Sequence, residues 1–130
     1  MNITRLYLLV AGLAFAGLGI FYLGAPIDMA RLTDFMLFSH TGIVEVQGFY
    51  GGQMLGIGVA LLLAVRRSWL VLPGLVLVAA TLGGTALGRL YGMVTGGEWP
   101  VLMIGLFALE IASAALAVYL IQRERPGASS

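Results

Sequence analysis

Two ionisable side chains of opposite sign, Arg89 and Glu110, each stand inside a long apolar run of the sequence. A charge at the centre of a bilayer costs about 2.5–3.5 kcal/mol on insertion scales, and more when it has no partner. Side chains lean toward the N-terminus of their own helix, so these two would lean toward each other across an antiparallel helix pair. We therefore expect a paired polar site inside a bundle of apolar helices.

Further polar residues are expected to join this pair in the outer half of the bundle. Gln47, Tyr50 and Gln53 recur at intervals of three, which places them on one helix face. Glu45 stands at the mouth of that segment, and Thr85 lies one turn before Arg89. The predicted ligand-binding or buried polar cluster comprises Tyr50, Gln53, Arg89, Glu110, Glu45, Gln47 and Thr85.

Such a cluster can serve as a structural ion pair, a ligand site, an ion path or a catalytic site. A guanidinium suits phosphate, carboxylate or carbonyl oxygens, so a lipid headgroup or a quinone-like molecule fits it. Proton or ion passage is less favoured, because the other half of the bundle offers no matching polar residues. Catalysis would use Glu110 as general acid or base, but no nucleophile–base pair accompanies it. No catalytic residue is therefore assigned, and a non-enzymatic role is favoured.

Composition restricts the class of protein and its cofactors. Of 130 residues, 60% are hydrophobic and only 10% are charged, whereas soluble domains carry about 25% charge. Cysteine is absent and His40 is the one histidine, so we expect no Fe–S cluster, haem or metal site. His40 is predicted to lie in an interfacial loop. The net charge of +1 does not indicate the basic surface that nucleic-acid binding requires. No cofactor is expected, apart from a lipid or quinone as ligand.

Four apolar segments are long enough to cross a bilayer, which takes about 20 residues. They cover residues 5–24, 46–65, 69–94 and 100–122. The predicted fold is all-α: a polytopic membrane protein with a bundle of four transmembrane helices and short loops, forming one domain over residues 1–130. The first segment has a single Arg before a long apolar stretch, so it is expected to be retained rather than cleaved as a signal peptide.

The arginines orient these segments. One side of the predicted membrane carries Arg5, Arg66, Arg67, Arg123 and Arg125. The positive-inside rule then places both termini in the cytoplasm. The tail 123–130 is polar and is expected to fray.

The one long connection, residues 25–45, lies on the outer side in this orientation. Its apolar residues recur at nearly helical spacing, namely Met29, Leu32, Phe35, Met36 and Phe38. A plain interfacial loop is favoured, and a short amphipathic helix on the interface or a lid over the bundle mouth are the alternatives.

Small residues recur at helical spacing in three of the segments, which lets helix backbones approach closely in lipid. Gly12, Ala16 and Gly19 mark the first segment. The other predicted packing positions are Gly52, Gly56, Gly84, Gly88 and Gly92. Packing within the chain is favoured, and a homo-oligomer interface is the alternative.

The motifs Phe49-Tyr50-Gly51-Gly52-Gln53, Gly88-Arg89 and Leu109-Glu110 resemble, in order and spacing, a bacterial family of small four-helix membrane proteins labelled only as a domain of unknown function. The resemblance spans nearly the whole chain and implies a bacterial inner (plasma) membrane protein without an established activity. Where it leads us to expect an Arg, this chain has Gln47. The architecture is also similar to that of DoxX-like proteins, some of which are membrane partners of quinone-linked oxidoreductases.

Three functions remain as hypotheses. The first is non-enzymatic binding of a small amphipathic ligand, with Arg89 holding its polar end, Glu110 orienting Arg89, and Gln53 and Tyr50 supplying hydrogen bonds. The second is a structural or accessory subunit of a larger membrane complex, in which the Arg–Glu pair is purely structural. The third is a membrane enzyme using Glu110. Membrane lipids are the expected partners, with a homo-oligomer or larger complex as further alternatives.

Overall fold

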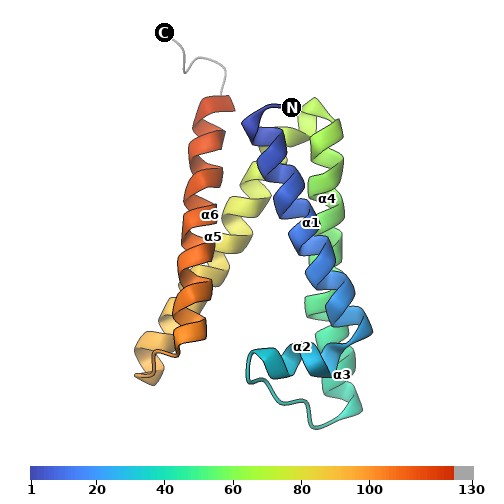
Figure 1. Ribbon diagram of the computed structural model, residues 1–130, viewed down its shortest axis with the longest axis vertical. Coiled ribbons are helices and arrows are strands. Elements are labelled where there is room, and N and C mark those ends of the chain that lie inside the picture. The colour runs from blue at the N-terminus through green and yellow to red at the C-terminus, as the bar shows by residue number, and fades with distance from the viewer. Residues whose placement is uncertain (125–130) are drawn as a thin grey trace. The chain divides into compact units, whose positions relative to one another are not determined.

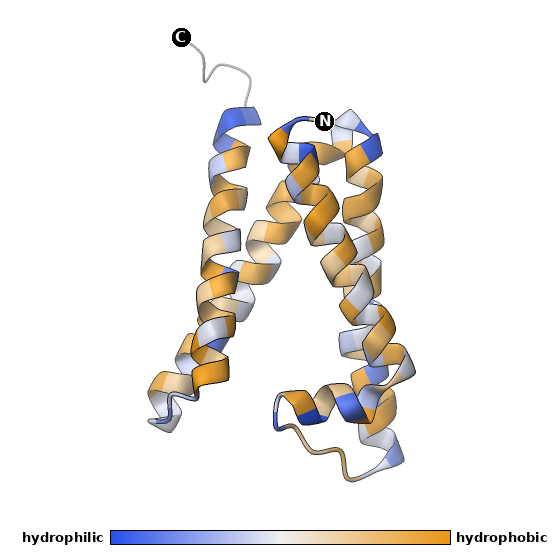
Figure 2. Ribbon diagram, in the orientation of Figure 1, coloured by the Kyte–Doolittle hydropathy of each residue, from blue (hydrophilic) through white to orange (hydrophobic). Residues whose placement is uncertain are grey.

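The computed structural model describes residues 1–124, and over that range the chain forms helices and no strand (Figure 1). Four helical stretches are long and apolar enough to cross a membrane: Ile3–Gly24, His40–Arg66, Ser68–Gly96 and Val101–Glu124. Apolar residues follow each of them along its length, with polar residues gathered near the ends (Figure 2). Helices that are apolar on every side are typical of membrane spans. The predicted all-α class is confirmed, while Arg125 and the rest of the predicted tail lie outside the described residues.

The chain divides into two compact units, Met1–Val71 and Leu72–Ser130, and each is described by itself. The first contains α1 (Ile3–Gly24), α2 (Pro26–Leu32), α3 (His40–Val46), the π-helical turn η1 (Gln47–Gly52), α4 (Gln53–Arg66) and the short 3₁₀ turn η2 (Ser68–Leu70). The second unit holds nearly all of α5 (Val71–Gly96) and the whole of α6 (Val101–Glu124). A single bundle over the whole chain stays a prediction.

Small residues bring α1 against the second membrane helix. A Cβ placed on Gly19 would lie 2.5 Å from the backbone nitrogen of Leu55, and one on Gly58 would overlap the backbone of Ala16. Gly12 packs on Leu62 in the same way, with a built Cβ 3.0 Å from that side chain. The first-segment stripe of small residues therefore forms the helix–helix contact that its spacing predicts.

The second membrane helix begins earlier than the sequence pattern predicts. Ser39 has extended backbone, and its side chain accepts a hydrogen bond of 3.1 Å from the Gly42 amide, which caps α3 at His40. The helix thus begins before the predicted span that starts at residue 46, and the predicted loop position of His40 is corrected, since His40 is the first residue of α3. Where the membrane begins along this helix stays a prediction. Hydropathy alone missed residues 40–45 because they are less apolar than the rest, whereas the cap decides where the helix starts.

The connection between α1 and α3 contains the short helix α2, which a Schellman motif terminates. The Phe35 amide donates to the Ala30 carbonyl at 2.9 Å, and the Asp34 amide donates to the Arg31 carbonyl at 3.1 Å. Asp34 takes the left-handed conformation that this motif requires, with φ 57°. This turn fixes the direction of the chain after α2 and so positions Phe35. Of the predicted alternatives, a short helix does form here.

The second unit is a helical hairpin with a tight connection. Gly97, at φ 70°, ends α5 and donates from its amide to the Met93 carbonyl at 3.0 Å. Glycine adopts such a conformation at no steric cost because it has no Cβ. The two helices approach closely at Gly83, where a built Cβ would lie 4.0 Å from the Ala114 methyl group.

The predicted packing glycines of the second and third segments do not lie at these contacts. A Cβ on Gly56, Gly84, Gly88 or Gly92 would meet no atom within 4 Å, and one on Gly52 only a carbonyl oxygen at 3.8 Å. Within each unit, the contacts use Gly51, Gly58 and Gly83 instead. Packing of the five predicted positions against another surface stays a prediction.

Candidate functional site

The helix carrying the Tyr-Gly-Gly motif contains a π-helical turn, Gln47–Gly52. Such turns are rare and occur frequently at functional sites, because the wider turn re-aims the side chains on it. Gln47 donates from its side-chain amide to the Leu23 carbonyl at 2.9 Å, which satisfies an orphan carbonyl at the end of α1. Gln47 therefore fastens the turn to α1 and is engaged by the backbone.

Tyr50 projects from the same turn and belongs to a group of aromatic rings. Its ring centroid lies 5.2 Å from that of Tyr22 on α1 and 6.1 Å from that of Phe49. Offset or tilted ring pairs at these distances are favourable beyond the area that they bury. The Tyr22 hydroxyl also hydrogen-bonds to the Thr33 side chain next to α2. The position of Tyr50 is thus set by α1, η1 and the end of α2 together.

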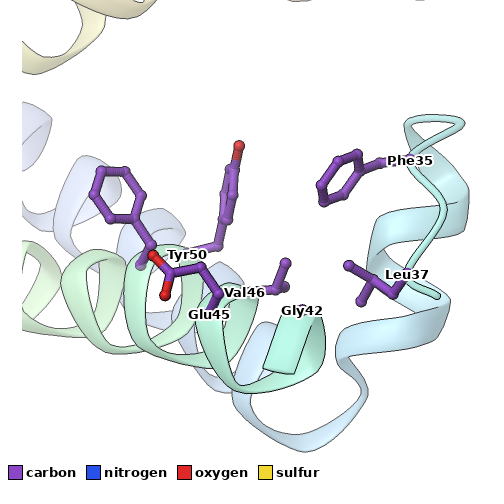
Figure 3. A pocket seen from close by; sticks show the side chains of 7 residues that line it. Phe35, Leu37, Gly42, Glu45, Val46 and Tyr50 are labelled. Carbon is purple, nitrogen blue, oxygen red and sulfur yellow. The ribbon is translucent and has the colours of Figure 1, made fainter. Parts of the chain in front are cut away.

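An open pocket of about 330 Å³ lies beside Tyr50, within the first unit (Figure 3). Phe35 and Leu37 approach it from the loop before α3, whereas Glu45 and Tyr50 belong to the membrane helix. The remaining lining residues are Gly42, Val46 and Phe49. Small-molecule sites are typically of this size, with mostly apolar walls and a few polar groups.

Glu45 is the one charged residue that lines this pocket. Within residues 1–124 its side chain has no hydrogen bond or ion pair with another residue. Glu45 precedes Arg66 by 21 residues in one helical stretch, which at about 1.5 Å per residue separates them by about 30 Å. This matches the hydrocarbon thickness of a bilayer. The helix between these two residues is therefore long enough to cross the hydrocarbon layer of a bilayer.

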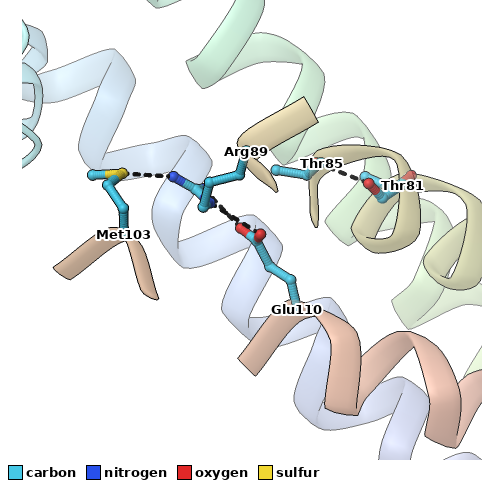
Figure 4. Close-up of polar contacts among 5 residues, drawn as sticks. All are labelled: Thr81, Thr85, Arg89, Met103 and Glu110. Atoms are coloured by element: carbon cyan, nitrogen blue, oxygen red, sulfur yellow. Dashed lines mark hydrogen bonds and ion pairs between the residues drawn. The ribbon is translucent and has the colours of Figure 1, made fainter. Parts of the chain in front are cut away.

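The second polar site is the pair between Arg89 on α5 and Glu110 on α6 (Figure 4). Arg89 donates from Nη2 to Oε1 of Glu110 at 2.8 Å and from Nε to Oε2 at 3.1 Å. Its Nη1 contacts the sulfur of Met103 at 3.0 Å. The two expected partners therefore form a bidentate ion pair, the strongest arrangement open to these groups.

The pair lies within the apolar part of the helices. Glu110 is the tenth of the 24 residues of α6, and its side chain is only 12% exposed, against 22% for Arg89. Thr85 lies one turn before Arg89, but its hydroxyl donates back to the Thr81 carbonyl at 2.8 Å (Figure 4). Thr85 is thus engaged with its own helix, whereas Met103 contacts Arg89.

The structure thus distributes the predicted cluster over two sites, one in each unit. Glu45 and Tyr50 line the pocket, Gln47 holds the turn beside it, and Gln53 is exposed at the start of α4. The predicted common face of Gln47, Tyr50 and Gln53 assumed an α-helix, and the π-helical turn displaces that register. Whether these residues act together with Arg89 and Glu110 on a ligand stays a prediction.

Sequence reasoning missed the apolar walls of the pocket and the role of Met103. Phe35 and Phe38 gave the same apolar signal in the sequence, and only the backbone turn after α2 distinguishes them. Phe49 stands inside the recognised motif and could have been included on that ground. Met103 lies seven residues before Glu110 and therefore on the same face of α6. This spacing could have indicated that Met103 and Glu110 contact the same residue, Arg89.

Comparison with known proteins places the chain in a family but gives no activity. No curated protein and no solved structure matches it significantly. The family model described as a domain of unknown function (DUF4345) matches residues 3–121, nearly the whole sequence. The chain therefore belongs to the DUF4345 family of proteins with a domain of unknown function.

Proposed function

We propose that this chain is a non-enzymatic integral membrane protein that binds a small amphipathic molecule, lipid- or quinone-like, in the pocket beside the π-helical turn. The observation that carries the proposal is the pocket itself, with its apolar walls and two polar groups, Glu45 and Tyr50. An apolar body would lie against Phe35 and Phe49, and the polar end would meet the carboxylate or the phenol.

The state of the two glutamates favours the pocket over the ion pair as the ligand site. Both oxygens of Glu110 accept hydrogen bonds from Arg89, so a ligand there would first have to displace a charged partner. Glu45 needs no such exchange, since its carboxylate has no partner among residues 1–124. The same geometry leaves catalysis by Glu110 without a supporting observation.

Native mass spectrometry of protein extracted gently from its own membrane tests the proposal. Phe35→Ala removes one wall of the pocket, and Phe38→Ala is the matched control, because Phe38 belongs to the same loop but lies 88% exposed outside the pocket. We expect a co-purifying small molecule whose retention falls about five- to tenfold in Phe35→Ala alone. A bare protein, or an equal loss in both variants, would contradict the proposal.

The orientation that suits this function places the pocket at the outer surface of a bacterial inner membrane, with both termini in the cytoplasm. Arg5 donates to the Ser68 hydroxyl at 3.1 Å, so the start of α1 and the end of α4 lie at one end of the first unit together with Arg66 and Arg67. The positive-inside rule assigns such an end to the cytoplasm, and the pocket belongs to the opposite end.

A role as subunit of a larger membrane complex or homo-oligomer is the second candidate. The observation that favours it is the stripe of Gly84, Gly88 and Gly92, which meets no neighbour within its own unit. In lipid such stripes commonly receive another helix. A Gly88→Leu variant that releases a partner or a second copy in native mass spectrometry would support this role, and an unchanged assembly mass would exclude that face.

A further inference from the structure

The side chains that line the pocket restrict the polar end of the ligand. Glu45 contributes a carboxylate, and neither Arg nor His is among the lining residues. An anionic headgroup would therefore meet an unopposed negative charge, while a cationic group would pair with Glu45. Charge complementarity thus favours a ligand with a positive polar end.

The aromatic walls narrow the choice further. Phe35, Phe49 and Tyr50 all line the pocket, and Tyr50 is held in place by its contact with Tyr22. The faces of aromatic rings attract cations, and ring clusters are the usual receptors for ammonium groups that carry alkyl substituents. A carboxylate beside several rings therefore suits an ammonium group better than a neutral quinone carbonyl.

The depth of Glu45 indicates where such a ligand comes from. A carboxylate about 30 Å along the helix from Arg66 lies at headgroup level, where the ammonium groups of membrane lipids also lie. The pocket is open, and Phe49 and Tyr50 on its membrane-helix side are 63% and 42% exposed. A lipid can thus present its headgroup to Glu45 while its chains stay along the apolar helix.

We propose that the pocket binds the headgroup of a membrane lipid that carries an ammonium group, with Glu45 as its counter-ion and Phe35, Phe49 and Tyr50 around it. This inference rests on the proposed function, because it names the class of ligand for the same pocket. A quinone, an anionic lipid and a free amphipathic amine are the alternatives that the test separates.

The test measures lipid retention by native mass spectrometry after delipidation of the full chain. The probes are lipids with identical acyl chains and phosphocholine, phosphoethanolamine or phosphoglycerol headgroups, together with an alkylamine and a quinone. Glu45→Gln is the test variant, and Glu98→Gln is its control, since Glu98 is an exposed glutamate in the connection between α5 and α6. We expect Glu45→Gln to lower retention of the ammonium lipids about five- to tenfold and to leave phosphoglycerol lipid unchanged.

The outcomes separate this inference from the proposed function. Suppose that lipids with every headgroup, or the quinone, are retained equally well in Glu45→Gln and Glu98→Gln, while Phe35→Ala lowers retention. The inference that the ligand carries an ammonium group is then overturned, and the proposed function stands. If the protein retains the alkylamine better than the lipids, the inference that the ammonium group belongs to a membrane lipid is overturned. If neither Glu45→Gln nor Phe35→Ala changes retention of any probe, both proposals are overturned.

Discussion

Glu45 and Glu110 are both glutamates of apolar helices, yet they differ in position along the helix, in exposure and in their partners. Glu110 lies near the middle of α6, its side chain is 12% exposed, and Arg89 engages both of its oxygens. Glu45 lies near the end of its helical stretch, is exposed, and has no partner within residues 1–124. A carboxylate at depth must be neutralised within the protein, whereas one at the interface can remain available. Under the proposed function, this difference makes Glu110 a structural group and Glu45 the group that meets the ligand.

The largest expected effect comes from removing the negative charge of the deep pair. Glu110→Gln removes the carboxylate that neutralises the Arg89 guanidinium, which cannot lose its proton, so we expect a loss of about 3–5 kcal/mol in the free energy of unfolding. Arg89→Gln is expected to cost less, about 1–3 kcal/mol, because a carboxyl group can be buried in its neutral form whereas a guanidinium cannot. Unfolding of the protein by SDS titration in mixed micelles measures both values.

Glu45→Gln is the control that sharpens this comparison. An exposed carboxylate without a partner contributes little to folding, so the change should stay within about 0.5 kcal/mol. If Glu45→Gln and Glu110→Gln destabilise equally, the distinction between a structural and an available glutamate is incorrect.

The glycines offer a second comparison, between helix faces that touch a neighbour in their own unit and faces that do not. Gly58→Ala pushes a methyl group into the Ala16 backbone and is expected to cost about 1–3 kcal/mol. Gly88→Ala meets no atom within 4 Å and is expected to stabilise α5 by up to about 1 kcal/mol, because alanine favours the helix. The same titration measures both. If Gly88→Ala instead destabilises the protein, another surface packs against the Gly88 face of α5.

The smallest effect is expected at Gln47, which lies beside the pocket but does not line it. Gln47→Leu removes the hydrogen bond to the Leu23 carbonyl and should cost about 1 kcal/mol. Because Glu45 and Tyr50 stay in place, retention of a co-purifying ligand in native mass spectrometry should change less than in Phe35→Ala. A larger loss of ligand than in that variant would assign Gln47 to the site itself.

Much of the fold could be predicted because the four spans depend on composition and length alone. The sequence also favoured a pairing of Arg89 with Glu110, since helix direction makes the two side chains lean together, but it left the contact itself open, and the structure shows that contact. The phase of the second helix could not be predicted: Gly52 and Gly56 have the ideal spacing, but Gly51 and Gly58 make the contact. The pocket depends on a π-helical turn and a left-handed Asp34, which are local backbone states without a hydropathy signal.

The ion pair also has a consequence for how the protein is made. Arg89 leaves the ribosome 21 residues ahead of Glu110, a delay of about one to four seconds at ordinary rates of synthesis. Until Glu110 follows, α5 alone would hold in lipid a charge that disfavours insertion by about 2.5–3.5 kcal/mol at the bilayer centre. The short connection between the helices brings the counter-charge as soon as it is synthesised. The ion pair therefore favours entry of α5 and α6 into the membrane together, as a hairpin.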